Sequence, residues 1–431
     1  MTAVVDDDGR PRRVKLLAPL RYRDFRLLWI GTTLSLLGDG VLLVALAWQA
    51  YQLSNSPVAM AMVGVALTVP QVVLVLVGGV ISDRMERRRV MLAADVVRAV
   101  CLAGLAVLSL SGEIQLWHLV AFAAVYGAAS AFFMPAFEAL VPSLVPQERL
   151  TEANALDQFL RPAMLWLLGP ALGGLLVGTA GAGGAFAFDA ATFAASAVCL
   201  LRLTRRQPQE TEALTVRAAV LELREGFVLV RSQPWLWVTF LAATLTYLLF
   251  LGPTEVLLPY LVKNELGGDA GDFGLILAAG GVSAVAAAFL IGQTGLPSRL
   301  MTFTYLAWAG ATLSVAGYGL ATTRWEAMTA AALVSGLETL GAVAWTTTKQ
   351  RLVPRDMLGR VSSFDWFISI SLVPVSYAVT APVAAALGVR ETLMGAGILG
   401  ALITVGFLFV PGVRAPDALL APDRVATGVA P

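Results

Sequence analysis

Residues 27–51 read LLWIGTTLSLLGDGVLLVALAWQAY and contain a single charged side chain, Asp39. A helix needs about 20 mostly apolar residues to cross the roughly 30 Å hydrocarbon core of a bilayer. This stretch is therefore predicted to be a transmembrane helix. Composition extends the same conclusion to the whole chain, because 58% of its 431 residues are hydrophobic and only 14% are charged.

Further apolar runs of similar length follow, each bounded by Gly, Pro or charged residues. Their expected limits are 58–82, 90–111, 116–137, 153–180, 185–203, 235–261, 273–292, 300–321, 325–347, 361–387 and 391–410. Together with 27–51 they predict an all-α membrane protein with twelve transmembrane helices.

Basic residues fall on alternate loops of this arrangement. With both chain ends on one side, 25 of the 30 Lys and Arg residues lie on that side, and only Lys263, Arg324 and Arg390 lie in loops on the other. Cytoplasmic loops retain Lys and Arg, so both termini are expected to be cytoplasmic. A missed helix would reverse this alternation, which supports the even number of helices.

The two halves of the chain resemble each other at a constant offset of 208 residues. The matched positions are Leu144-Val145-Pro146 with Leu352-Val353-Pro354, Asp157 with Asp365, Phe159 with Phe367, and Trp29 with Trp237. Parallel repeats are found in transporters built from two related helical bundles. The sequence therefore predicts two six-helix bundles, over 27–203 and 235–410.

Three polar or low-complexity segments complete the predicted organisation. Residues 1–26 are expected to form a cytoplasmic arm and 411–431 a disordered cytoplasmic tail. Residues 204–234 form the polar linker between the bundles. Its apolar residues recur at helical spacing, which favours a helix lying in the headgroup layer; a solvated connector is the alternative.

Several classes of function find no support in the sequence. The two cysteines, Cys101 and Cys199, and the single histidine, His118, provide neither a disulfide framework nor a set of metal ligands. A net charge of +1 gives no reason to expect a nucleic-acid partner. No phosphate-binding loop or nucleophile motif is present, so we expect no cofactor and no enzymatic chemistry.

The loop after the second predicted helix, residues 79–89, reads GVISDRMERRR. It resembles the signature loop of the major facilitator superfamily (MFS), although the family pattern has Gly where this chain has Glu86. The resemblance implies a conformational latch that closes the cytoplasmic side, and it assigns this role to Gly79, Asp83, Arg84, Arg87 and Arg88. Asp83 would face the positive N-terminal end of the eleventh helix, near Arg360. The alternative is that the arginines only fix the orientation in the membrane.

A second resemblance lies in the fifth predicted helix, which carries Gly169-Pro170-Ala171-Leu172-Gly173-Gly174. This segment is similar to the core of a motif found in MFS exporters, where a further small residue precedes it at the position of Leu165. Small residues allow close helix contact, and Pro170 removes one backbone hydrogen bond from the helix. The resemblance implies export through Gly169, Pro170, Gly173 and Gly174; glycine-rich packing without directional meaning is the alternative.

Three further stretches are similar to the drug and siderophore exporter branch, which includes macrolide and enterobactin exporters. They are RDFRLLW at 23–29, SLLGD at 35–39, and ANA at 153–155 together with FDA at 188–190. The branch implies a monomer in the bacterial inner membrane that exports a small hydrophobic or amphiphilic molecule by alternating access. With no site for ATP, the energy source would be a proton gradient; sodium is the alternative ion.

Ionisable side chains inside a membrane are costly, so each is a functional candidate. Asp39, near the middle of the first helix, is the first candidate for proton coupling, and Glu338, near the middle of the tenth, is the second. An apolar environment disfavours a charged carboxyl group, so proton uptake there can drive a change of state. The alternative for each is a structural carboxylate bonded to a neighbouring hydroxyl or amide.

Other intramembrane residues are expected to line a cavity or a gate. Asp95 and Arg98 are three residues apart and are predicted to form a structural ion pair. Arg161 has no evident local partner, and Asp189 and Glu255 are expected near the outer, water-accessible ends of their helices. The residues assigned to a cavity or gate are Arg161, Asp189, Phe240, Tyr247, Phe250 and Glu255. For the three aromatic rings, lipid-facing packing is the alternative.

Proton-linked export is thus the function that the sequence predicts. An uptake or sugar-efflux permease is an alternative of the same class, and the Gly-Pro segment of the fifth helix speaks against uptake. A transporter-like sensor that binds a ligand without moving it is an alternative of another class. That alternative would leave the intramembrane carboxylates without a role.

Overall fold

The computed structural model describes residues 17–146, 149–204, 216–354 and 357–420. Within these ranges, the backbone alone is described for residues 75–84, 139, 151, 155, 158, 159 and 216–223. All described secondary structure is helical.

The N half of the molecule consists of helices, three of which, α5, η4 and α6, follow one another without a loop. The elements are η1 (Ala18–Arg21), α1 (Arg23–Leu53), α2 (Pro57–Arg84), α3 (Arg87–Leu110), α4 (Leu116–Leu140), η2 (Val141–Ser143), α5 (Leu150–Pro162), the π-helical η4 (Ala163–Leu168) and α6 (Gly169–Leu201). The chain runs from α5 through η4 into α6, and the π-helical turn follows Pro162, which cannot donate a backbone hydrogen bond.

The linker helix α7 (Val216–Ser232) leads into the C half. The elements there are α8 (Pro234–Gly252), the π-helical η5 (Pro253–Leu257), α9 (Leu258–Tyr260), the π-helical η6 (Leu261–Glu265), α10 (Ala270–Thr294), α11 (Leu300–Leu320), α12 (Arg324–Leu352), α13 (Leu358–Ile370), α14 (Val373–Leu387), α15 (Val389–Leu408) and α16 (Ala415–Leu419).

Eleven helical segments among the described residues are long and apolar enough to cross a membrane, and one of them accounts for two crossings. That segment, Leu160–Leu201, has 42 residues. At 1.5 Å per residue it would extend about 63 Å, roughly twice the bilayer core. Gly181 interrupts it with a φ of +70° and a ψ of 174°, a conformation that favours glycine. The predicted fold class with twelve crossings is confirmed.

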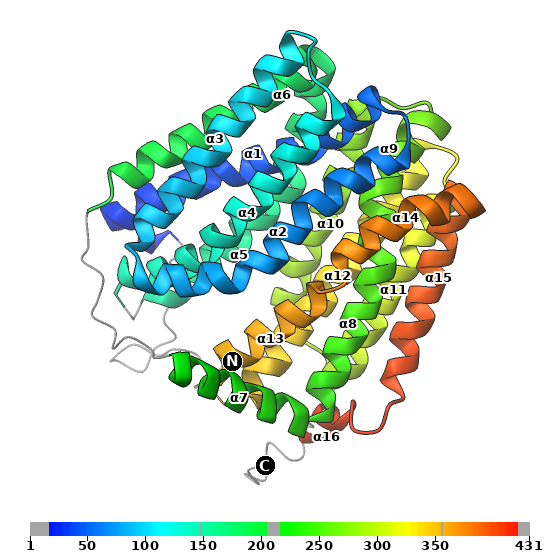
Figure 1. Cartoon of the computed structure of the whole chain (residues 1–431). Helices are drawn as coiled ribbons and strands as arrows, with labels where there is room; N and C mark the ends of the chain where they lie inside the picture. Colours follow the sequence, from blue (N-terminus) through cyan, green and yellow to red (C-terminus); the bar gives the residue numbers. More distant parts are fainter. Residues whose placement is uncertain (1–16, 147–148, 205–215, 355–356, 421–431) are drawn as a thin grey trace.

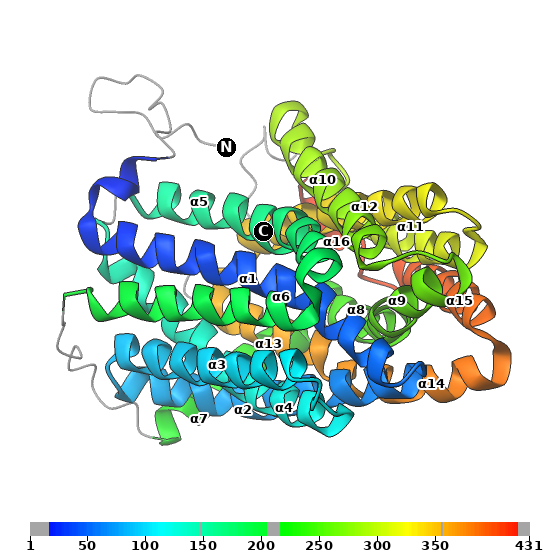
Figure 2. The same ribbon diagram turned by 90° about the horizontal axis from the view of Figure 1, so that it is seen from above.

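The twelve crossings form two groups that lie side by side (Figures 1 and 2). In the N half, α1 packs on α6 and α2 packs on α4; in the C half, α11 packs on α12 and α15. The two groups meet where α10 contacts α6 and η4, and where α14 contacts α2. Gly281 of α10 permits this close approach, since a Cβ there would lie 2.4 Å from the carbonyl oxygen of Trp166.

The two ends of the bundle differ. We call the end where α1 begins and α15 ends the terminal face, and the opposite end the distal face. Figure 1 shows the two halves close together at the distal face and further apart towards the terminal face, where α7 runs across the bundle. The helices of the two halves therefore diverge towards the terminal face.

The repeat predicted from the sequence is visible in the broken helices. α5 and α13 each have 13 residues, and their bounds differ by the same offset of 208. α5 is followed by the π-helical η4 and α13 by a turn at Ser371–Leu372. The regular helix is therefore interrupted at equivalent positions of the two halves.

Two predictions about the ends of the chain need correction. The tail was expected to be disordered from residue 411, yet Ala415–Leu419 form α16. The Asp417 carboxylate accepts hydrogen bonds from the backbone N–H groups of Met301 (2.7 Å) and Thr302 (3.1 Å) and so caps α11. Residues 421–431 of the predicted tail and 1–16 of the predicted arm lie outside the described residues, and α1 begins at Arg23, inside the predicted arm.

Candidate functional site

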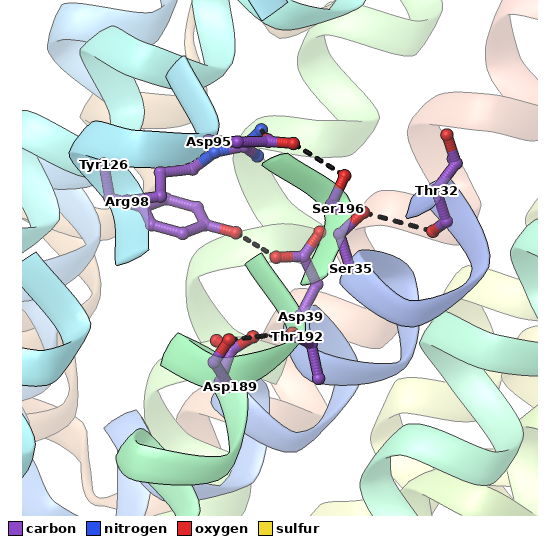
Figure 3. A network of polar contacts seen from close by, with 9 residues as sticks. All are labelled: Thr32, Ser35, Asp39, Asp95, Arg98, Tyr126, Asp189, Thr192 and Ser196. Atoms are coloured by element: carbon purple, nitrogen blue, oxygen red, sulfur yellow. Dashed lines mark hydrogen bonds and ion pairs between the residues drawn. The ribbon is translucent and has the colours of Figure 1, made fainter. Parts of the chain in front are cut away.

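A polar network occupies the middle of the N half. It joins α1, α3, α4 and α6 through side chains that point towards one another in Figure 3. The members with interacting side chains are Asp39, Asp95, Arg98, Tyr126, Asp189, Thr192 and Ser196. Small residues let these helices come close: a Cβ on Gly38 would lie 2.0 Å from Oδ1 of Asp189.

Asp39 and Asp95 take different partners in this network. The Tyr126 hydroxyl donates a hydrogen bond to Oδ1 of Asp39. Arg98 forms an ion pair of 2.6 Å with Oδ1 of Asp95, and the Ser196 hydroxyl donates to Oδ2 of Asp95 at 2.6 Å. The predicted Asp95–Arg98 pair is therefore present, and Ser196 completes its hydrogen bonding.

The network holds more carboxyl groups than cations. Asp39, Asp95 and Asp189 face the guanidinium of Arg98, which lies within electrostatic range of all three, and Arg161 also acts on Asp39. The rings of Phe193 and Phe133 lie 4.3 and 4.6 Å from the guanidinium carbon of Arg98 and hold the cation by cation–π contact. A proton on one of the carboxyl groups would reduce the excess of negative charge.

Asp189 is a correction to the sequence analysis, which placed it near water at the end of its helix. The residue is completely buried. Thr192 donates to its Oδ1 at 3.0 Å, while its Oδ2 has no hydrogen-bond partner among the described residues. The break at Gly181 starts the second crossing of α6 eight residues before Asp189, which brings the carboxyl group well inside the bundle.

The C half contains an aromatic cavity instead of an ionic network. This C-half cavity has a volume of about 250 Å³ and is lined by residues of the C half, among them Tyr247, Phe250, Trp308, Trp345 and Trp366. Glu338 of α12 also lines it and makes no hydrogen bond or ion pair with any described residue. Its carboxyl group is available to a ligand.

A second carboxyl group of the C-half cavity is fully engaged. Asp365 pairs with Lys349 at 2.5 Å, accepts a hydrogen bond from Nε1 of Trp345 at 2.8 Å, and is contacted by the Ser369 hydroxyl at 3.3 Å. The pair is intramembrane but neutral, so Glu338 carries the uncompensated charge of this cavity.

The N half has a cavity of its own, nearer the terminal face. This N-half cavity has a volume of about 350 Å³ and lies between the beginning of α1, the end of α4 and the beginning of α5. Its lining includes Phe25, Trp29 and Thr32 of α1, Glu138 of α4 and Asp157 of α5.

The remaining predicted cavity and gate residues fall in several places. Tyr247 and Phe250 line the C-half cavity, whereas Phe240 is completely buried against Trp345. Arg161 does have a local partner, contrary to expectation, because Asp157 one turn earlier lies 3.6 Å away. Glu255 lies on η5 and accepts a hydrogen bond from the Tyr377 hydroxyl of α14.

The predicted latch is only partly described. Gly79, Asp83 and Arg84 lie at the end of α2, where the side chains are outside the described set, so the contact of Asp83 remains a prediction. Arg87 is the first residue of α3. Arg88 donates to the carbonyl oxygens of Leu200 (2.6 Å) and Leu201 (2.8 Å) and thereby caps the end of α6 in its own half.

The helix start that Asp83 was expected to face, near Arg360, also makes contacts of its own. Arg360, near the start of α13, pairs with Glu225 of the linker helix α7 at 2.8 Å. Phe227 of α7 stacks near Phe364 of α13, with ring centroids 6.3 Å apart. The linker is thereby attached to the helix that the latch was expected to hold.

The Gly-Pro segment of the fifth crossing lies between the two halves. A Cβ on Gly169 would lie 2.5 Å from the Cα of Gly40 in α1, and a Cβ on Gly174 would lie 2.7 Å from the carbonyl oxygen of Ala270 in α10. Pro170 and Gly173 share this segment, Pro170 facing α10 and Gly173 facing α1. The segment therefore packs on α1 within the N half and on α10 of the C half.

Among the described residues, three hydrogen bonds join the halves at the distal face. Tyr51 at the end of α1 donates through its hydroxyl to the Val256 carbonyl oxygen of η5, and Lys263 donates to the Tyr51 carbonyl oxygen. Asn55 donates to the side chain of Asn264 at 2.6 Å. The i to i+5 pairing of the π-helical η5 and η6 shifts the backbone register here, so carbonyl groups are presented to α1.

These features define the class of protein: a polytopic membrane transporter with two repeated bundles that diverge towards one face, and with a polar network inside one of them. A family model described as transmembrane secretion effector, within the MFS, matches residues 14–421. The chain belongs to this family. It is a membrane transporter and not an enzyme.

The relatives match over most of their length. Macrolide efflux protein A of Streptococcus pyogenes is 23% identical over 92% of this chain and 99% of its own. The multidrug efflux pump Tap of Mycolicibacterium fortuitum is 24% identical over 88% and 94%, and the enterobactin exporter EntS of Shigella boydii serotype 18 is 26% identical over 78% and 80%. The predicted drug and siderophore exporter branch of the MFS is confirmed.

A solved structure supports the fold alone. The bacterial homologue of the human lysosomal transporter Spinster, in an inward-facing and unoccupied conformation, superposes with a TM-score of 0.65 at 14% identity, over 96% of this chain and 99% of that one.

Sequence reasoning missed several members of the site. Tyr126, Thr192 and Ser196 lie in apolar runs and were not singled out, although each supplies a hydroxyl to a buried carboxyl group. A search for polar residues at the level of Asp39 in the other crossings would have found them.

Proposed function

We propose that this transporter exports a small hydrophobic or amphiphilic molecule in exchange for protons. Asp39 carries the proton, and the molecule binds in the C-half cavity. The protein works as a monomer in the bacterial inner membrane with both termini in the cytoplasm, so that the terminal face is the cytoplasmic face.

The observation that carries the proposal is the Asp39 network. Three carboxyl groups face the guanidinium of Arg98, and Arg161 also acts on Asp39. Asp39 is only partly buried while Asp95 and Asp189 are completely buried, so an arriving proton reaches Asp39 first. Its charge changes the contact with Tyr126 and, through Arg98, the packing of α1 against α3 and α6.

The C-half cavity supports the substrate class. Aromatic rings provide apolar area for a drug-sized molecule, and Glu338 provides one polar contact. Glu338 remains the second candidate for coupling, since it lines the C-half cavity and, unlike Asp365, has no ion pair or hydrogen bond with a described residue.

The relatives support export rather than uptake. Their printed functions are efflux of macrolides, efflux of several drugs and export of enterobactin. The contacts at the distal face and the divergence of the halves towards the terminal face fit a conformation that is open to the cytoplasm and ready to load (Figure 1).

The test is export from an efflux-deficient bacterium that expresses the chain. Accumulation of a panel of lipophilic fluorescent dyes is measured with and without an uncoupler, for wild type, Asp39→Asn and Asp39→Glu. Wild type should lower accumulation, the uncoupler should abolish that effect, and Asp39→Asn should resemble the empty vector. Asp39→Glu, which keeps a carboxyl group, should retain part of the activity.

Two results would contradict the proposal in different ways. Export by Asp39→Asn that remains sensitive to the uncoupler would move the coupling role to Glu338. Increased accumulation on expression of the wild type would favour an uptake permease.

A further inference from the structure

The two cavities lie at equivalent positions of the internal repeat. At the offset of 208, five lining residues of the N-half cavity correspond to five of the C-half cavity: Phe137 to Trp345, Glu138 to Thr346, Val141 to Lys349, Asn154 to Ser362, and Asp157 to Asp365. The equivalence of α5 and α13 supports this register. The N-half cavity is thus the counterpart of the proposed substrate cavity.

The two counterparts differ in charge. In the C half, Lys349 neutralises Asp365 at 2.5 Å. In the N half Val141 takes the place of Lys349, and the cation beside Asp157 is Arg161, which is not part of the cavity lining. Glu138, also in the lining, is exposed and has no ion pair or hydrogen bond with a described residue. Arg161 also acts on Glu138, so two carboxyl groups of the wall face this one neighbouring cation and an excess of negative charge remains.

Two buried polar atoms of the N-half cavity lack a partner. Nε1 of Trp29 and Oγ1 of Thr32 are inaccessible to solvent and make no hydrogen bond within the described part of the chain. Thr32 is only 5% exposed. Buried polar atoms are nearly always hydrogen-bonded. Two unpaired groups lining one cavity therefore indicate a ligand that pairs with them.

The position of the cavity fits a loading site. Its α1 residues are close to the terminal face, and Thr32 precedes Asp39 by seven residues, which is about two helical turns. Residues seven apart lie on the same face of a helix, so the cavity lies on the route from the terminal face to Asp39.

We propose that the N-half cavity is a second ligand site, which takes an amphiphilic amine with a hydroxyl, ether or carbonyl oxygen near the amine. The ammonium group faces Glu138 and Asp157, the oxygen accepts from Trp29, and the hydrocarbon part contacts Phe25 and Phe137. This inference rests on the proposed function, because it assigns the exported molecule to the class of amphiphilic amines that load at this site.

The test is binding of propranolol, an amphiphilic amine with a hydroxyl and an ether oxygen, to the purified full-length chain in lipid nanodiscs. The Glu338→Gln protein is the background, so that the C-half cavity lacks its free carboxyl group. Adding Glu138→Gln, or Trp29→Phe, should raise the dissociation constant roughly tenfold in each case. The uncharged N-acetyl derivative should bind weakly and should not respond to Glu138→Gln.

Trp237→Phe is the matched control. Trp237 is the repeat equivalent of Trp29 but lines neither cavity, so its substitution should leave binding unchanged. Equal dissociation constants for Glu138→Gln, Trp29→Phe and Trp237→Phe would overturn the inference.

The export assay separates this inference from the proposed function. Export in cells together with unchanged binding by Glu138→Gln and Trp29→Phe would overturn the second site and leave the exporter standing. Weakened binding by both variants, in a protein that exports none of the lipophilic amines, would uphold the site and overturn export.

Discussion

The two halves of this transporter share a helical repeat but differ in the chemistry of their centres. In the N half, Asp95 and Arg98 form an ion pair whose side chains are 0% and 5% exposed, surrounded by further carboxyl groups. In the C half, the Lys349–Asp365 pair is 10% and 15% exposed and stands beside an aromatic cavity.

The repeat shows how the difference arises. Asp39 of the N half corresponds to Tyr247 of the C half, and Tyr126 corresponds to Val334. Each substitution exchanges a member of the polar network for an aromatic or apolar side chain on the same scaffold. In the proposed mechanism, one bundle therefore handles charge while the other binds an apolar molecule.

The largest expected effect comes from breaking the two ion pairs. Arg98→Met leaves Asp95 in a dry bundle without its cation, which should destabilise the fold by about 3–5 kcal/mol. Lys349→Met should cost less, because Asp365 keeps the hydrogen bond from Trp345 and is more accessible. Thermal unfolding of the purified variants in detergent would rank them. Equal losses of Tm would show that the two ion pairs contribute equally to stability, contrary to this prediction.

A second prediction addresses the contact between the halves. Gly281→Ala places a methyl group against the Trp166 carbonyl oxygen, and the overpacking should cost roughly 1–3 kcal/mol. This contact joins α10 of the C half to η4 of the N half. The loss of dye export should therefore be larger than the modest fall in Tm would explain. Gly104→Ala is the control, since no atom lies within 4 Å of a Cβ at that position. If both variants export like wild type, close contact at Gly281 is not needed for transport.

The smallest effect concerns the distal face. Tyr51→Phe removes the hydrogen bond to Val256, worth about 0.5–1.5 kcal/mol, and should increase opening of the distal face about two- to tenfold. Hydrogen–deuterium exchange of residues 253–265 measures this opening. Tyr305→Phe removes a hydrogen bond to Thr239 inside the C half. It should leave the hydrogen–deuterium exchange of residues 253–265 unchanged. A faster exchange in both variants would point to general loosening of the bundle.

The architecture was predictable because it depends on hydrophobicity and length. Apolar runs near 20 residues, alternating loop charges and the repeat around Leu144 and Leu352 were sufficient for twelve crossings in two bundles. The π-helical turn η4 was not predictable from local propensity alone, because its backbone packs closely against the distant Gly40 and Gly281. The short helix α16 was missed because it is held by Asp417 reaching α11, a contact distant in sequence.

The candidate site was predictable only in part. Asp39 and Glu338 stood out as charges in apolar runs, and the spacing of Asp95 and Arg98 indicated their pairing. The link from Asp39 to Tyr126 spans 87 residues, and the packing of α4 against the other helices decides which hydroxyl meets which carboxyl group. Arg161 was misread for a simpler reason: the partner at Asp157, one helical turn away, was overlooked.

The central claim, that the N half couples protons and the C half binds the molecule, is tested most directly in proteoliposomes that contain the purified chain. Two quantities are measured for Asp39→Asn and Glu338→Gln: exchange of a labelled lipophilic amine without a gradient, and its accumulation driven by a pH gradient. Asp39→Asn should retain exchange and lose accumulation, whereas Glu338→Gln should lose both. Gradient-driven accumulation by Asp39→Asn, or loss of exchange in that variant to the same extent as in Glu338→Gln, would contradict the claim.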